Sequence, residues 1–130
     1  MIDEIYKELN KLISYLKDDE KSKVYKALKL SEAAHGNQLR KSGDPFITHP
    51  LEVAKILTSL RLDGDSIVAG LLHDTLEDTN IKISEINENF GDEISDLVQG
   101  LTKISKYSLK VNNQKFGENY KKLILATTED

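Results

Sequence analysis

Hydrophobic residues recur at spacings of three and four along nearly the whole chain, which is the period of an amphipathic α-helix. The first predicted helix carries its apolar face at Ile5, Leu9, Leu12, Ile13 and Leu16 and stops in the charged stretch 17–20. A second helix is predicted from about residue 20 to residue 39, with Val24, Leu28 and Ala34 facing inward. No stretch of useful length alternates between apolar and polar residues, so the sequence predicts an all-α fold.

The middle of the chain combines a loop with a long apolar helix. The stretch RKSGDPFITHP, residues 40–50, contains one glycine and two prolines and is predicted to be a loop. Pro50 suits the first position of a third helix, over LEVAKILTSL, where its missing N–H costs nothing. The next helix, capped by Asp65, is predicted to run unbroken through SIVAGLLHDTLED. Its apolar circumference predicts a central, buried position.

Shorter segments complete the pattern. Ser84 is expected to cap a helix that ends at Phe90–Gly91, and Asp92 to cap another that reaches about Ile104. Residues 105–117 are predicted to be a polar loop, and NYKKLILATTED to begin a last helix. Neither glycine nor proline follows LILATTED, so we expect the chain to end inside its domain.

Composition restricts the class of protein. The 130 residues fit one domain, and 31% charged with 38% hydrophobic residues indicate a soluble globular chain. The absence of cysteine excludes a disulfide scaffold, a thiolate metal site and a cysteine nucleophile. A net charge of −4 argues against non-specific binding to nucleic acid or anionic lipid. Without a signal peptide or a long apolar run, we expect a cytoplasmic protein that does not enter membranes.

One helix end crowds acidic side chains beside a histidine. His73 and Asp74 are adjacent, and Glu77 and Asp78 follow within a turn. Carboxylates at this spacing repel by roughly 0.2–0.5 kcal/mol per pair, and the helix dipole adds roughly 0.3–1 kcal/mol of cost for each. A bound cation would reverse these signs, and imidazole with carboxylate suits a borderline or hard divalent ion. The local pattern leaves a metal site and a solvated acidic helix end equally open.

The remaining candidate residues carry weaker signals. Arg40 and Lys41 form a cationic pair beside a glycine turn, which suits a phosphate or a purine face but is more typical of a solvated helix end. His35 is expected to be structural, and His49 to lie on a surface loop. The lysine-rich stretch 101–128 favours an exposed basic face over a polyanion-binding site.

Four segments, taken together, resemble a known family. AAHGNQLRKSGDPFITHPLEVAKIL, AGLLHDTLEDT, FGDEISDLVQGLTKIS and ENYKKLILATTED follow in the order and spacing of the RelA/SpoT homologues, from about residue 20 to the end. They match the N-terminal HD-type domain of that family, a helical bundle that hydrolyses the alarmone (p)ppGpp. The resemblance implies hydrolysis of the 3′-diphosphate to GDP or GTP and pyrophosphate, with manganese, in the stringent response.

The resemblance also implies roles for single residues. His49, His73 and Asp74 would be three of the four protein ligands of a manganese ion. The acidic pair Glu77 and Asp78 would position or deprotonate the attacking water.

The nucleotide would be held by the loop. The resemblance implies that Arg40 and Lys41 pack around the guanine base and its neighbouring groups, with Ser42 close by.

The chain departs from the family pattern at its end. The fourth ligand of the family, an aspartate in an LADRxHN-like helix, would follow Asp130. Residues 1–130 are therefore expected to be a partial HD-type domain without synthetase or regulatory domains, and to be weak or inactive alone. Two alternatives stay open: a non-catalytic remnant or interaction fragment, and an HD-type phosphohydrolase acting on another nucleotide. The sequence does not determine the oligomeric state.

Overall fold

The computed structural model describes residues 2–36, 38–39, 43 and 48–107, and none of these residues forms a β-strand. Within this part of the chain, no helix is both long enough and apolar enough to cross a membrane. The predicted all-α class is confirmed. The helices, in chain order, are α1 (Ile2–Leu12), α2 (Asp18–His35), α3 (Thr48–Ser59), α4 (Gly64–Leu72), α5 (Thr75–Asp78), α6 (Ile83–Phe90) and α7 (Asp92–Tyr107).

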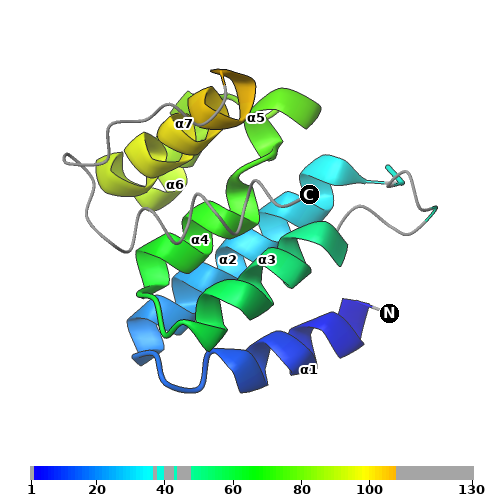
Figure 1. The fold of residues 1–130 in the computed structure, drawn as a ribbon, viewed down its shortest axis with the longest axis vertical. Coiled ribbons are helices and arrows are strands. Elements are labelled where there is room, and N and C mark those ends of the chain that lie inside the picture. The colour runs from blue at the N-terminus through cyan, green and yellow to red at the C-terminus, as the bar shows by residue number, and fades with distance from the viewer. Residues whose placement is uncertain (1, 37, 40–42, 44–47, 108–130) are drawn as a thin grey trace.

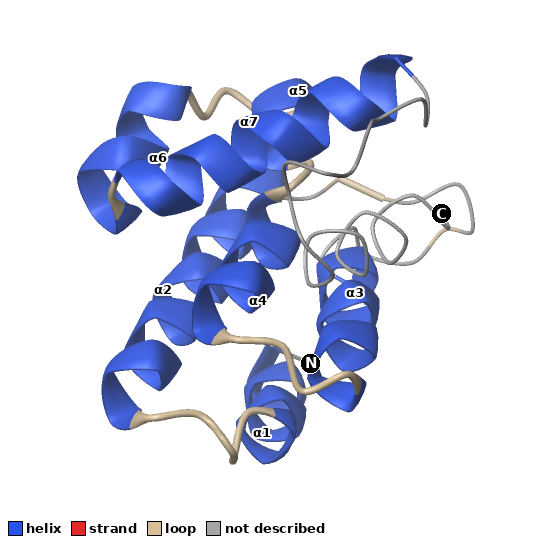
Figure 2. Cartoon of the chain, turned by 60° about the vertical axis from the view of Figure 1, so that its left-hand side comes forward, coloured by secondary structure: helices blue, strands red, loops and turns tan. Residues whose placement is uncertain are grey.

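Helix α4 lies at the centre of the bundle, as its apolar sequence predicts. It packs against α2, α3 and α7, and α6 packs against α7. Figures 1 and 2 show α6 and α7 together on one side of α4, and α1, α2 and α3 on the other. All residues of α4 except Asp65 are buried, because each face of the helix meets a neighbouring helix.

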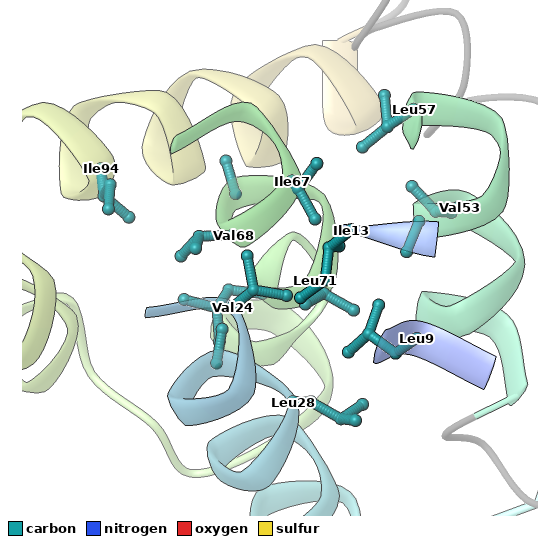
Figure 3. Close-up of a cluster of buried hydrophobic side chains, with 14 of the residues drawn as sticks. Leu9, Ile13, Val24, Leu28, Val53, Leu57, Ile67, Val68, Leu71 and Ile94 are labelled. Atoms are coloured by element: carbon teal, nitrogen blue, oxygen red, sulfur yellow. The ribbon is translucent and has the colours of Figure 1, made fainter. Parts of the chain in front are cut away.

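The hydrophobic core gathers side chains from α1, α2, α3, α4, α6 and α7, and Figure 3 shows part of this cluster. Leu9 of α1 and Ile13, which follows the end of α1, lie next to Leu28 of α2 and Leu71 of α4. Each of these four side chains is at most 1% exposed. Burial of such a side chain contributes about 1.5–3 kcal/mol relative to exposure. The three- and four-residue spacing in the sequence therefore marks the true core face of these helices.

Hydrogen bonds hold the beginning of α4 against α2 and against the turn between α1 and α2. The Glu20 carboxylate accepts hydrogen bonds from the backbone N–H of Lys17 at 3.2 Å and from that of Gly64 at 3.0 Å. One side chain thus holds the N-terminal ends of both α2 and α4. The Tyr15 hydroxyl donates to the Leu62 carbonyl at 2.5 Å, which ties the turn between α3 and α4 to the turn between α1 and α2.

The second helix ends four residues earlier than predicted. Gly36 takes φ of +54°, and its N–H bonds the Glu32 carbonyl at 3.0 Å. Glycine adopts positive φ at little cost, so it ends helices at this position. Val24 and Leu28 are buried as predicted, but Ala34 is only half-buried, and His35 takes an inward position.

The helix predicted over residues 66–78 is divided in two. His73 and Asp74 form a turn between α4 and α5. The His73 Nδ1–H donates to the Gly70 carbonyl at 2.6 Å, and the Thr75 hydroxyl donates to the Leu72 carbonyl at 2.7 Å. Side-chain bonds of this kind compete with the helical backbone ladder. The prediction of one unbroken helix was therefore wrong at the two residues of greatest chemical interest.

Several predicted helix ends also shift. Asp63, not Asp65, caps α4, with its carboxylate accepting from the Ser66 N–H at 3.0 Å. Pro50 is the third residue of α3 rather than the first, still among the four positions whose N–H has no helical partner. Helix α6 begins after Lys82 rather than Ser84, and ends at Phe90 as predicted.

The start of the predicted polar loop was also wrong, because α7 continues to Tyr107 rather than ending near residue 104. The predicted last helix, 119–130, lies outside the described residues.

Candidate metal centre

Three side chains with metal-binding atoms meet where α3 begins and α4 ends. His49 lies in the first turn of α3, and His73 and Asp74 directly follow the last residue of α4. Because α3 packs along α4, residues separated by 24 positions in the chain become neighbours. His49 was predicted to lie on a surface loop, and that prediction was wrong: it is helical and 5% exposed.

The donor atoms form a nearly equilateral triangle. His49 Nε2 lies 3.1 Å from His73 Nε2, and each of these nitrogens lies 3.1 Å from Asp74 Oδ2. Ligands bonded at about 2.1 Å to one ion, at right angles to each other, are about 3.0 Å apart. In the part of the chain that is described, these residues are the group of histidine and acidic side chains close enough to hold one ion.

Hydrogen bonding sets the protonation of His73. Its Nδ1 lies 2.6 Å from the Gly70 carbonyl oxygen, which can only accept, so Nδ1 carries the proton. In the neutral ring, Nε2 then directs its lone pair toward Asp74 and His49. Orientation of a ligating histidine by a backbone carbonyl on its other nitrogen is typical of metal sites. The Thr102 hydroxyl of α7 donates to the Val98 carbonyl at 2.9 Å and makes only a longer second contact, 3.4 Å, with the His73 carbonyl.

The electrostatics of the cluster call for a positive charge at its centre. Burial opposes a charge on His73, but the hydrogen bond and charge of Asp74 raise the pKa of this imidazole above its ordinary value. Burial likewise opposes ionisation of Asp74, yet the bonds from His49 and His73 hold the pKa of this carboxyl below its usual range. A proton on His73 satisfies three converging electron-pair donors. A divalent cation would satisfy them with more charge, so the donor set fits a divalent metal.

The acidic pair lies on α5, next to this cluster in the chain. Glu77 and Asp78 are both exposed, and Asp74 is the acidic residue that precedes them in the chain. Partial desolvation and the charge of Asp74 raise the pKa of Asp78. The imidazoles of His35, His73 and His49 oppose that shift. The Asp78 N–H also bonds the Asp74 carbonyl at 2.9 Å, which ties α5 to the residue that carries the cluster's carboxylate.

The other predicted site residues have a different outcome. Arg40, Lys41 and Ser42 lie outside the described residues. The structure adds one contact that the sequence gave no signal for: the Gln38 amide donates to the Asp78 backbone carbonyl at 2.9 Å. Gln38 is an ordinary polar residue in the sequence, and its contact with Asp78 arises because the end of α2 packs against α5.

Known proteins are similar to this chain in sequence and in fold. A family model described as HD domain matches residues 27–130. The guanosine-3′,5′-bis(diphosphate) 3′-pyrophosphohydrolase of Aquifex aeolicus is 46% identical over 95% of the chain and 17% of its own length. A GTP pyrophosphokinase of Myxococcus xanthus is 47% identical over 89% and 16%. The bifunctional (p)ppGpp synthase/hydrolase SpoT of Escherichia coli is 36% identical over 97% and 18%.

These relatives are much longer proteins, of which the chain spans less than a fifth. A solved structure described as a metazoan ortholog of SpoT that hydrolyzes ppGpp superposes with a TM-score of 0.67. It is 24% identical, and the match covers 81% of this chain and 65% of that one. This likeness concerns the fold, and it agrees with the family match. The chain belongs to the HD domain family.

Proposed function

We propose that this chain forms a hydrolase domain that removes pyrophosphate from the 3′ position of (p)ppGpp, with a divalent metal ion held by His49, His73 and Asp74. The observation that carries the proposal is the triangle of donor atoms, with all three edges at 3.1 Å. The 3′-pyrophosphohydrolase relative, 46% identical over 95% of the chain, supports the substrate.

The proposed reaction breaks one phosphorus–oxygen bond. Water attacks the phosphorus attached to the 3′ oxygen, the bond to that oxygen breaks, and pyrophosphate leaves. One proton from water ends on the released groups, so ppGpp gives GDP and pppGpp gives GTP. A divalent ion at such a site lowers the pKa of water and stabilises charge on phosphoryl oxygens. We propose Mn²⁺ as that ion, since a carboxylate ligand suits it and the resemblance to the RelA/SpoT homologues implies it.

The acidic pair is assigned to the proton of the attacking water. The pKa of Asp78 is raised by partial desolvation and by Asp74, which makes its carboxylate a stronger base than an ordinary one. Glu77, adjacent and exposed, would orient the same water. Both side chains extend from a single helical turn, so a small movement of that turn displaces them together.

The nucleotide is assigned to residues 40–42, which follow α2 in the chain. We propose that Arg40 and Lys41 contact the guanine base and neighbouring groups, with Ser42 beside them. A planar guanidinium stacks on aromatic rings and an ammonium provides a compact charge, so the pair suits a purine carrying phosphates. Residues 1–130 would thus contribute part of an HD-type hydrolase domain.

The experiment is a turnover assay with the protein in excess over nucleotide, so that slow hydrolysis is detected. Wild type and Asp74→Asn are incubated with ppGpp and Mn²⁺, and anion-exchange chromatography separates GDP from ppGpp. We expect GDP and pyrophosphate in equal amounts from wild type, and a loss of at least about 100-fold in the variant, the larger effect seen for metal-site changes. Equal rates for wild type and variant, or release of orthophosphate instead, would refute the proposal. Parallel samples with ATP and GTP test the nucleotide class.

A further inference from the structure

Helix α5 is a single turn that carries both proposed catalytic acids. It spans only Thr75–Asp78, far shorter than a helix that is stable by itself. Its first residue is buried, whereas Glu77 and Asp78 are exposed. The buried, hydrogen-bonded Thr75 and the packing of Leu76 against the core therefore hold the beginning of this turn, and its exposed end needs polar contacts.

Those contacts come partly from within the turn. The Asp78 N–H bonds the Asp74 carbonyl at 2.9 Å, and the Thr79 hydroxyl bonds the Thr75 carbonyl at 2.6 Å. The carbonyl of Asp78 is among the last four of the helix, which have no helical partner. Gln38 satisfies it: the side-chain amide donates to this oxygen at 2.9 Å across 40 positions of the chain.

The position of Gln38 is itself fixed at the end of α2. Gly36 turns the chain out of the helix, and the Gln38 N–H then bonds the His35 carbonyl at 3.0 Å. The His35 ring is 3% exposed, so the residue that accepts this bond is anchored in the core. The Gln38 backbone is thus tied to a buried residue while its side chain reaches the exposed end of α5.

We propose that Gln38 is a positioning residue that holds α5 against α2, so that the Asp78 carboxylate stays beside the His49–His73–Asp74 cluster. Its relevance to catalysis rests on the function proposed above. Gln38 acts through the backbone carbonyl of Asp78, and its side chain also lies beside the buried His35 ring. Because Gln38 is exposed, its replacement removes the bond without opening the core.

The test compares three variants of the full chain. Gln38→Ala removes the side chain, and Gln38→Glu keeps its shape but removes the N–H donor and places a carboxylate against a carbonyl. Lys29→Ala, at an exposed position of α2, is the matched control. For each protein, amide hydrogen exchange is measured along the chain, Mn²⁺ affinity by titration, and kcat and KM for pyrophosphate release from ppGpp.

We expect exchange at Asp78 and Thr79 to become about 2- to 12-fold faster in both Gln38 variants, the factor that corresponds to about 0.5–1.5 kcal/mol for one hydrogen bond. Exchange in α4 and Mn²⁺ affinity should stay as in wild type, as should every property of Lys29→Ala. The value of kcat should fall by about 3- to 100-fold, since misplacement near 1 Å costs up to about that much. KM should change by less than about 2-fold on the same reasoning.

Three outcomes would overturn the inference. They are unchanged exchange at Asp78 and Thr79 in Gln38→Glu, faster exchange throughout the chain, and unchanged kcat despite faster exchange in α5. A wild type that releases no pyrophosphate would instead refute the proposed function. In that case the exchange comparison still decides whether Gln38 holds α5.

Discussion

Replacement of Asp74 by asparagine tests whether the metal-binding cluster behaves as its geometry requires. The substitution keeps the size of the side chain and removes one negative charge from between two imidazoles. Each imidazole nitrogen lies 3.1 Å from the carboxylate oxygen. A full charge pair at that distance interacts by about 5 kcal/mol at an effective dielectric constant of about 20.

Desolvation offsets part of that energy. Breaking a buried ion pair by removing one partner costs about 3–5 kcal/mol. The Asp74 side chain is 21% exposed, so solvent screens it in part and the lower end of that range applies. We expect Asp74→Asn to lower the free energy of unfolding of the metal-free protein by about 3 kcal/mol at a pH where His73 is charged.

The sign of the pH dependence follows from the two pKa shifts. The pKa of His73 is raised above 6.5, so its contribution to stability is complete below 6.5 and is lost as the pH rises through the folded-state pKa. The pKa of Asp74 is lowered below 3.8, so its contribution is present above 3.8 and is lost as the pH falls through the folded-state value. The effect of the substitution should therefore be largest between these two limits and should shrink as the pH rises through the His73 titration.

The assay is urea unfolding of both proteins with a chelator present, over a pH series from about 5 to 10, which covers the ordinary histidine range and its raised tail. Mn²⁺ at about 100 times its Kd for wild type should raise the free energy of unfolding of wild type by about 2.7 kcal/mol relative to the metal-free protein. The same Mn²⁺ concentration should stabilise Asp74→Asn by much less. A destabilisation that does not vary with pH, or equal stabilisation of both proteins by Mn²⁺, would refute the electrostatic account of this cluster.

Three further substitutions test the framework around the site by urea unfolding. Tyr15→Phe removes the bond to the Leu62 carbonyl and should cost about 0.5–1.5 kcal/mol; no change would show that this 2.5 Å contact contributes nothing net. Gly64→Ala would place a Cβ 2.9 Å from the Glu20 Cβ, which cannot swing away, so a loss of about 1–3 kcal/mol is expected; an unchanged midpoint contradicts this close approach. Arg61 has φ of +56° and its guanidinium lies 4.9 Å from the Tyr15 ring centre, so Arg61→Gly relieves about 1–2 kcal/mol of strain and forfeits about 0.5–1 kcal/mol of cation–π energy. The result should be neutral to slightly stabilising, and a clear loss would show that the stacking dominates.

The core was predictable because helical periodicity is a local property of the sequence. Leu9, Val24 and Leu28 recur at helical spacing, and each is fully buried. The central position of α4 followed from the same kind of observation, since a helix that is apolar on all sides needs neighbours on all sides. Its true cap, Asp63, was missed because Asp63 and Asp65 are equally good caps by residue type.

The break between α4 and α5 depended on competition that the sequence pattern does not reveal. His73 and Thr75 each direct a side-chain donor to a carbonyl of the preceding turn, in place of an unbroken helix. The turn that results sets the directions of His73 and Asp74. A helical projection of the sequence therefore predicted that His73 and Asp74 lie side by side but gave them the wrong local geometry.

The sequence by itself determined which residues have metal-binding chemistry and which faces of the helices are apolar, because both depend on residue type and spacing. The family resemblance implied that His49 joins His73 and Asp74, but only the tertiary structure brings their donor atoms to 3.1 Å, because that contact requires α3 to lie against α4. The tertiary structure likewise gave Gln38 a partner on α5. Local patterns specify helices, whereas contacts between distant residues arise only when those helices pack. The packing of α3 against α4 brings the His49 imidazole to His73 and Asp74 in that way.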